Sequence, residues 1–286
     1  MNSIMKLLGI KTMGTETRNP KSLGLSEMNA AEIVHLMNEE DRSVAEAVRA
    51  CADSIARIAE IYADTVRRGN RVFYLGAGTS GGLAQLDAAE MTPTFGLPAD
   101  TIIALTAEEN MDYTGNAEDS ALRAVEQLKA HHLNRYDLVI GLAASGSTPY
   151  VVEGLRYAKE VGAVTAAIAC NEHSVIGQLA DDKAEVLTGP EVLTGSTRLK
   201  AGTAEKMVLN MISTAAMVLN GKVMSNFMVD MKPSNTKLIK RAKSIVMEVT
   251  GCEEAEAEEA MRNADNHCKT AIGLIQQNQG RKGGDE

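Results

Sequence analysis

Two short loops combine glycine with hydroxyl side chains, which is the composition of a phosphate-binding site. In the loop at 76–82, Gly-Ala-Gly-Thr-Ser-Gly-Gly, the glycines let a ligand approach the backbone closely, and Thr79 and Ser80 add hydroxyl donors. An apolar run precedes the loop and a helix-forming segment follows it. Because the first N–H groups of a helix have no internal partner, a junction of this kind binds anions.

The first loop alone does not define a ligand, since it lacks the Gly-Lys-Ser/Thr of a Walker loop and the acidic residue of a dinucleotide fingerprint. A purely structural turn is its alternative interpretation. The second loop, 143–149, repeats the pattern with hydroxyls at Ser145, Ser147 and Thr148, and Pro149 suits a first helical turn. Together the two loops predict a phosphorylated ligand, with two unrelated helix caps as the alternative.

Strand-like and helix-like segments alternate around these loops. The predicted strands are 71–75, 101–105, 137–143, 163–169 and 184–187, and the predicted helices are 80–90, 117–131, 149–161, 174–180 and 202–220. Alternation of this kind predicts an α/β fold, a doubly wound parallel five-stranded sheet with flanking helices. Ligands of such sheets bind at the carboxyl ends of the strands, where both loops fall.

The whole chain divides into four predicted parts. Residues 1–25 form a loosely held N-terminal arm, 26–232 the α/β domain with its N-terminal helices, 233–279 a small C-terminal helical appendage, and 280–286 a disordered tail. Capping boxes at Asn29 and at Ser43 predict that the N-terminal helices are two, one ending near Glu40 and one ending at Gly69.

Bulk properties exclude several classes of function. The net charge of −9 argues against a nucleic-acid or anionic-membrane partner, because no basic stripe is available. No apolar run is long enough to span a bilayer and no signal peptide precedes the domain, so we expect a cytoplasmic protein. The four cysteines lack paired spacing and the five histidines lack ligand spacing, so we expect reduced thiols and no metal site.

Several longer motifs show that the chain resembles a known protein family. The two loops resemble those of sugar isomerase (SIS) domains, and nearly the whole chain resembles the N-acetylmuramic acid 6-phosphate etherase family. The segments that carry this resemblance are Thr15-Glu-Thr-Arg-Asn-Pro20, Asn38-Glu-Glu-Asp41, Gly76-Ala-Gly-Thr-Ser-Gly81, Asp87-Ala-Ala-Glu90, Ala117-Glu-Asp119, Ala143-Ala-Ser-Gly146 and, longest, Gly189-Pro-Glu-Val-Leu-Thr-Gly-Ser-Thr-Arg-Leu-Lys-Ala-Gly-Thr-Ala204.

The resemblance implies a lyase that releases D-lactate from a phosphosugar ether and leaves N-acetylglucosamine 6-phosphate, with no metal or cofactor. Glu90 and Glu118 match the positions of the family's two catalytic glutamates. Glu90 would protonate the departing lactyl oxygen and then activate water, and Glu118 would abstract the proton or assist ring opening; the division of roles between them stays open. The resemblance also implies a homodimer.

Further site residues carry over from the resemblance. A dianionic ligand in an acidic protein needs local positive charge, which makes the basic residues of 188–204 candidates; surface solvation is the alternative for Lys200. The predicted substrate and phosphate contacts are Gly78, Thr79, Ser80, Ser145, Gly146, Ser147, Thr148, Glu191, Ser196 and Lys200, with Arg198 as a further candidate.

The chain also departs from the family pattern. Gly82 and Ser147 stand where the family usually has arginine, and Ala107-Glu-Glu109 replaces an Ala-Gly-Gly turn. Two positive charges near the ligand are therefore missing. Two alternatives to the etherase follow, a related enzyme acting on another phosphosugar and a non-catalytic sugar-phosphate sensor; retention of both glutamates counts against the sensor.

Overall fold

The computed structural model describes residues 14–108, 120–231, 233 and 236–282. Contacts divide the chain into two units. Unit 1 comprises Met1–Asp87 and Thr101–Ala216, and unit 2 comprises Ala88–Asp100 and Met217–Glu286.

Unit 1 is built on a parallel sheet of five strands, as predicted. The strands are β1 (Val72–Gly76), β2 (Ile102–Thr106), β3 (Leu138–Leu142), β4 (Val164–Ala169) and β5 (Asp182–Glu185). Their order is β2-β1-β3-β4-β5, so β1 pairs with β2 on one side and with β3 on the other. The loops after β1 and β3 therefore leave the sheet next to each other at its switch point, where ligands bind in folds of this kind.

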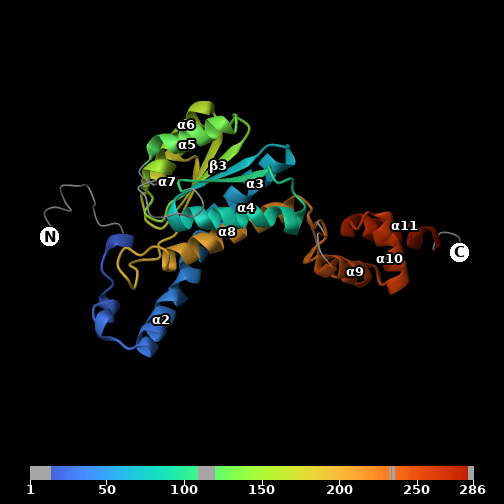
Figure 1. The fold of residues 1–286 in the computed structure, drawn as a ribbon, viewed down its shortest axis with the longest axis horizontal. Helices are drawn as coiled ribbons and strands as arrows, with labels where there is room; N and C mark the ends of the chain where they lie inside the picture. The colour runs from blue at the N-terminus through green and yellow to red at the C-terminus, as the bar shows by residue number, and fades with distance from the viewer. Residues whose placement is uncertain (1–13, 109–119, 232, 234–235, 283–286) are drawn as a thin grey trace. The chain divides into compact units, whose positions relative to one another are not determined.

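Helices cover both faces of the sheet, which confirms the doubly wound architecture (Figure 1). The helices are α3 (Ala52–Arg67), α4 (Gly78–Phe95), α5 (Ala121–Ala130), α6 (Pro149–Val161), α7 (Val175–Leu179) and α8 (Lys200–Leu219). Helices α5, α6 and α7 share one buried core with Phe73 and Leu75 of β1. On the opposite face Tyr74 donates a hydrogen bond to Asp87 of α4 at 2.8 Å, and Ser213 of α8 donates to the same carboxylate at 2.9 Å.

Helix α2 (Ala30–Arg49) begins at the capping box predicted at Asn29. It does not end near Glu40, so the prediction of a second helix starting at Ser43 is wrong. Ser43 lies inside α2, where its hydroxyl donates to the carbonyl of Glu40 at 2.8 Å instead of capping a new helix. Val44 and Val48 continue the buried stripe, and packing of that stripe carries the helix through Ser43.

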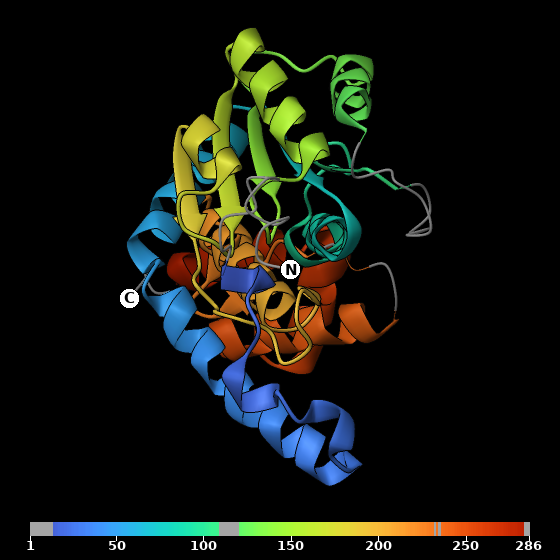
Figure 2. The same ribbon diagram turned by 90° about the vertical axis from the view of Figure 1, so that its left-hand side faces the viewer.

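Residues 14–27 belong to the arm expected to be loosely held, but they form three short 3₁₀ helices, Gly14–Glu16, Pro20–Ser22 and Leu25–Glu27, and the segment turns back along α2 (Figure 2). The Thr15 N–H donates to Asn171 Oδ1 at 3.2 Å, and Asn171 Nδ2 donates to Thr15 Oγ1 at 2.9 Å. Asn19 Nδ2 donates to Glu40 Oε2 at 2.7 Å. The described part of the arm is therefore fixed to unit 1 by buried hydrogen bonds.

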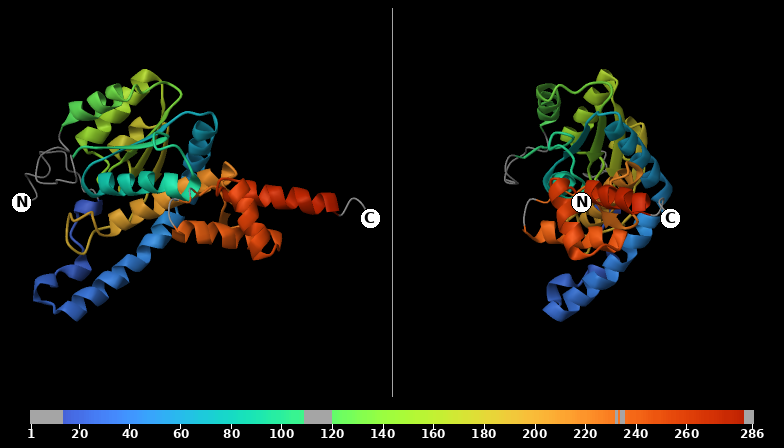
Figure 3. Two further views of the ribbon diagram at one scale, coloured as in Figure 1. Left: turned by 45° about the vertical axis from the view of Figure 1, so that its right-hand side comes forward. Right: turned by 90° about the vertical axis from the view of Figure 1, so that its right-hand side faces the viewer.

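Unit 2 is a small helical body with its own core (Figure 3). Its elements are the hairpin β6 (Val223–Met224) and β7 (Phe227–Met228) and the helices α9 (Thr236–Thr250), α10 (Glu254–Asn263) and α11 (Cys268–Lys282). Val229 and Met231 are buried in this core, so unit 2 takes in residues before the boundary expected at 233. Helix α11 runs to Lys282, three residues into the segment predicted to be a disordered tail.

None of the described helices is long and apolar enough to cross a membrane.

Candidate active site

A cavity of about 370 Å³ lies at the carboxyl ends of β1 and β3, and we call it the switch-point pocket. Its lining residues are Glu16, Ala77, Gly78, Thr79, Ser80, Ala143, Ala144, Ser145, Ser147, Thr148, Pro149 and Thr197. Six of the predicted phosphate contacts are thus brought together, from two loops more than 60 residues apart in the chain. The lining residues described here include no lysine, arginine or histidine, in keeping with Gly82 and Ser147 at the two positions where arginine was expected from the family pattern.

The start of α4 forms one wall of this pocket. Helix α4 begins at Gly78, with only Ala77 between it and the last residue of β1, and Gly78 has a φ of +54°, a backbone conformation that side chains with a Cβ rarely adopt. Thr79 and Ser80, the next two residues of this turn, line the pocket with their hydroxyl-bearing side chains.

The start of α6 forms the facing wall. Thr148 is the N-cap of α6, yet its side chain makes no capping hydrogen bond, so the hydroxyl stays available to a ligand. Gly146 has a φ of +76°, and a Cβ built on it would lie 2.3 Å from Ser174 Cβ. Gly146 is not among the lining residues; it sets the turn that carries Ser145 and Ser147 into the pocket.

Two carboxyl groups, neither of them predicted as a site residue, hydrogen-bond to donors of this pocket. The N–H of Gly78 donates to both oxygens of Glu108 at 3.0 Å. Ser80 Oγ lies 3.0 and 2.8 Å from the two oxygens of Glu205, which is buried on α8. Burial raises the pKa of Glu205 to about 8, against the opposing effect of the Ser80 hydrogen bond.

A sequence signal for Glu205 exists. It falls at helical spacing with Ala201, Val208 and Leu209, all buried, so an acid stands on the apolar stripe of a helix. Glu108 lies in the Ala107-Glu-Glu109 turn that departs from the family pattern, but its contact with Gly78 could not be predicted, because only the pairing of β1 with β2 brings the two residues together.

The segment that precedes α8 contributes less to the pocket than expected. Glu191 is fully buried and accepts the N–H groups of Lys200 and Ala201 at 3.0 and 2.9 Å, which caps α8; burial raises its pKa, and these two donors oppose the rise. The ammonium of Lys200 donates to Glu40 Oε2 at 3.0 Å and is 3% exposed. Neither side chain lines the switch-point pocket. Thr197, a residue of the same segment that was not predicted as a site residue, does line the pocket.

The remaining candidates lie elsewhere. Ser196 is half-buried and Arg198 is exposed, and neither lines the pocket. Glu90 is exposed on α4, three residues beyond Asp87. Glu118 lies outside the described residues. Within the described residues, no group of three or more His, Cys, Asp or Glu is placed to hold a metal ion.

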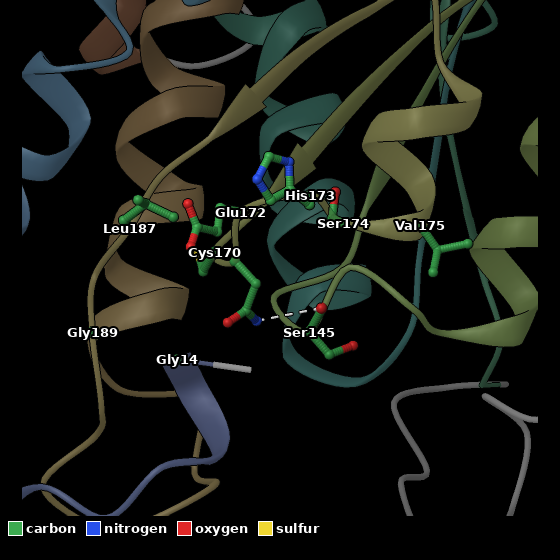
Figure 4. Close-up of a pocket in the computed structure, with 10 residues that line it drawn as sticks. Gly14, Ser145, Cys170, Glu172, His173, Ser174, Val175, Leu187 and Gly189 are labelled. Carbon is green, nitrogen blue, oxygen red and sulfur yellow. Dashed lines mark hydrogen bonds between the residues drawn. The ribbon is translucent and has the colours of Figure 1, made fainter. Parts of the chain in front are cut away.

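Figure 4 shows the residues that line a second cavity of about 530 Å³, which we call the β4 pocket. It is lined by Gly14, Ser145, Cys170, Asn171, Glu172, His173, Ser174, Val175, Leu187 and Gly189. Asn171 Nδ2 donates to the carbonyl oxygen of Ser145 at 3.3 Å, so the segment after β4 is tied to the loop after β3. Ser145 lines both pockets.

Comparison with known proteins places these features in a family context. The model of the SIS domain matches residues 36–170, and the model of the C-terminal lid domain of glucokinase regulatory protein matches residues 225–275. The N-acetylmuramic acid 6-phosphate etherase of Mycolicibacterium smegmatis is 48% identical, over 94% of this chain and 91% of that protein. The etherase of Geobacillus thermodenitrificans is 50% identical, over 93% of this chain and 91% of that protein.

Among solved structures, a phosphoheptose isomerase from Francisella tularensis matches with a TM-score of 0.56 and 16% identity, covering 67% of this chain and 100% of that one. The phosphoheptose isomerase from Neisseria gonorrhoeae matches with a TM-score of 0.51 and 17% identity, covering 65% and 98%. At this identity the two structures establish the shared fold alone.

Proposed function

This chain belongs to the N-acetylmuramic acid 6-phosphate etherase family, and we propose that it cleaves the D-lactyl ether of N-acetylmuramic acid 6-phosphate to N-acetylglucosamine 6-phosphate and D-lactate during cell-wall recycling. The observation that carries this conclusion is the similarity to curated etherases, 48% and 50% identical over at least nine-tenths of both chains. The switch-point pocket supports it, because its donors suit the phosphate that such a substrate carries.

The substrate's phosphate would lie between the starts of α4 and α6. There the hydroxyls of Ser80, Ser145 and Thr148 converge on one cavity at the starts of two helices. The helix dipoles favour negative charge at the same place, which partly offsets the lack of a basic side chain among the described lining residues. Thr79, Ser147 and Thr197 add further hydroxyls.

The reaction itself needs only proton transfers. Opening of the pyranose exposes an aldehyde, which acidifies the hydrogen on the adjacent carbon. A base removes that proton, the C–O bond to the lactyl oxygen breaks as an acid protonates it, and water adds across the resulting double bond. One ether and one water thus become one hydroxyl sugar and one lactate. Positioned acids and bases typically contribute about 10²–10⁴-fold to such steps.

For the two proton-transfer roles we propose Glu90 and Glu118, on the strength of their match to the family motifs. Glu90 would protonate the leaving lactyl oxygen and then activate the water, and Glu118 would abstract the proton or assist ring opening. Since both are carboxyl groups, the pair can serve as acid and base only if their surroundings hold their pKa values apart.

We further propose that the enzyme works in the cytoplasm as a homodimer and needs no metal or cofactor. Family resemblance supports the dimer, and the proton-transfer chemistry supports independence from metals. Activity retained after exhaustive dialysis against EDTA, and a mass near twice that of the chain by light scattering, are the expected results.

A second candidate function is that of a lyase or isomerase with the same fold that acts on another phosphosugar. Gly82 and Ser147 favour it, because the described lining residues lack the basic groups expected near the ligand. Release of D-lactate decides between the two, measured with N-acetylmuramic acid 6-phosphate and a coupled D-lactate dehydrogenase assay.

We expect release by the wild type and loss of release in both Glu90→Ala and Glu118→Ala. Asp100→Ala, which removes an exposed acid outside α4, serves as the matched control and should retain activity. A wild type that binds phosphosugars but releases no lactate would overturn the etherase in favour of the second candidate.

A further inference from the structure

Ser80 and Glu205 form a hydrogen-bonded pair that joins the switch-point pocket to the protein interior. Ser80 Oγ lies 3.0 Å from Glu205 Oε1 and 2.8 Å from Oε2. Ser80 lines the pocket, whereas Glu205 is 1% exposed and does not. Within the described residues the Ser80 hydroxyl is the one hydrogen-bonding partner of the Glu205 carboxyl group.

The protonation state of Glu205 decides which way the Ser80 hydrogen points. A carboxylate can only accept, so an ionised Glu205 takes the Ser80 hydrogen and leaves oxygen lone pairs facing the pocket. A protonated Glu205 donates its own hydrogen to Ser80 Oγ, which frees the Ser80 hydrogen for a ligand oxygen. Only the second arrangement suits a phosphate, because a phosphate dianion offers acceptors and no donor.

We propose that Glu205 is a positioning residue of the phosphate site: it binds a proton when a phosphosugar binds and thereby turns the Ser80 hydroxyl toward the phosphate. This inference rests on the proposed function, since it assumes that the phosphate lies beside Ser80.

The charges around Glu205 support this role. The elements nearby carry four other buried carboxyl or thiol groups, Asp87, Glu108, Cys170 and Glu191, none of which can neutralise a Glu205 carboxylate. The buried cation of α8, Lys200, donates to Glu40, and Lys206, the next residue on α8, is exposed. Burial raises the pKa of the Cys170 thiol, and a charge on Glu205 adds to that rise, which places the two groups close together.

Burial in this setting raises the pKa of Glu205 to about 8, so the free enzyme is partly ionised under mildly alkaline conditions. A phosphate dianion bound next to Ser80 raises that pKa further, because like charges disfavour each other's ionised form. Phosphate binding and proton uptake at Glu205 therefore favour one another, and each must strengthen the other to the same degree.

The test is calorimetric titration of N-acetylglucosamine 6-phosphate, which is the product and is not turned over, into the full-length enzyme. Between pH 7 and pH 9 the ligand stays dianionic, because its second phosphate pKa lies near 6. For a group that titrates near pH 8 and must be protonated in the complex, we expect the wild type to bind about tenfold more weakly at pH 9 than at pH 7. At pH 8 the binding enthalpy should change with the buffer, reporting uptake of about half a proton.

Two variants separate positioning from mere packing. Glu205→Gln keeps the shape and supplies a permanent donor to Ser80, so its affinity should match the wild type at pH 7 and stay constant to pH 9 without proton uptake. In turnover assays at pH 9, Glu205→Gln should have a lower KM than the wild type and nearly the same kcat. Ser80→Ala removes the responding hydroxyl, so it should bind weakly at every pH and also lose the linked proton.

The outcomes distinguish this inference from the proposed function. Binding without proton uptake in the wild type, or the same pH dependence in Glu205→Gln as in the wild type, overturns the role of Glu205 even if lactate is released. Failure of the wild type to release lactate overturns the etherase, yet proton-linked binding that both variants lose would still support the role of Glu205. Absence of phosphosugar binding overturns both.

Discussion

Glu108 accepts the backbone N–H of Gly78 with both carboxylate oxygens, each 3.0 Å from the nitrogen, so an acid of the protein occupies a donor at the first residue of α4. A ligand phosphate must compete with this carboxylate for the amide and also meets its negative charge. Glu108→Ala should therefore tighten phosphosugar binding and lower KM by roughly tenfold, as expected for release of one charge-assisted hydrogen bond worth about 1.5 kcal/mol.

The control for Glu108→Ala is Glu60→Ala, which removes the same charge from an exposed position on α3. Steady-state KM and product inhibition by N-acetylglucosamine 6-phosphate give the comparison. An unchanged or higher KM in Glu108→Ala alone would show that the carboxylate organises the loop rather than competing with the ligand.

Glu40 and Lys200 form an ion pair at 3.0 Å, with side chains that are 9% and 3% exposed. Burial favours the neutral acid, but hydrogen bonds from Lys21, Lys200 and Asn19 outweigh it and lower the pKa of Glu40 to about 2. Glu40→Ala leaves the Lys200 ammonium buried without its partner, so we expect a loss of about 3–5 kcal/mol in the free energy of unfolding, measured with urea.

Lys21→Ala is the matched control, because Lys21 binds the other oxygen of Glu40 from an exposed position. Its unfolding midpoint should stay close to that of the wild type. The wild type should also lose stability as the pH falls from about 4.5 toward 2, where folded Glu40 takes up its proton, and Glu40→Gln should lack this component. Equal losses in Glu40→Ala and Lys21→Ala would contradict the assignment.

The raised pKa of Glu205 predicts the opposite pH dependence. An unfolded chain ionises this carboxyl near pH 4.5 and the folded chain near pH 8, so the free energy of unfolding falls as the pH rises between those values. Glu205→Gln cannot ionise and should not lose stability in this way. Its free energy of unfolding should exceed that of the wild type by on the order of 4 kcal/mol at pH 8, with little difference at pH 4. Urea unfolding at both pH values tests it, and Glu60→Gln controls for a general charge effect.

Substitution of Gly146 and of Gly69 by alanine separates two destabilising effects, strain in the backbone and crowding of the added Cβ. Their φ angles are +76° and +77°, but a Cβ at Gly146 would lie 2.3 Å from Ser174 Cβ, whereas a Cβ at Gly69 would meet nothing within 4 Å. Gly69→Ala should cost about 1–2 kcal/mol from strain alone. Gly146→Ala should cost clearly more and weaken phosphosugar binding, because the loop that carries Ser145 must shift. Equal unfolding free energies for the two variants would rule out the crowding.

Local patterns predicted much of unit 1. The strands, the span of α6 and the two glycine loops follow from apolar runs and turn residues that act over a few positions, and six predicted phosphate contacts meet in one pocket. The failures came where packing overrides a local signal. Ser43 begins a sequence pattern typical of a helix cap, yet packing of the buried stripe of α2 keeps Ser43 inside the helix.

The partners of the charged groups were the least predictable part of the site. Lys200 was a candidate for the ligand site, with surface solvation as the alternative, and the structure instead shows its ammonium donating to Glu40, 160 positions away in the chain. Glu191, another site candidate, accepts the N–H groups of Lys200 and Ala201 and so caps α8. Such pairings depend on how distant segments meet, which no spacing along one segment records.

One residue, Ser145, is common to the switch-point pocket and the β4 pocket. For inhibitor chemistry this means that two weak fragments can be joined: a small anion at the starts of α4 and α6, and an uncharged group beside Asn171. A short flexible linker that runs past Ser145 from one pocket to the other would present the second fragment at an effective concentration in the millimolar range. Affinity could then grow by tethering, without copying the sugar that the enzyme cleaves.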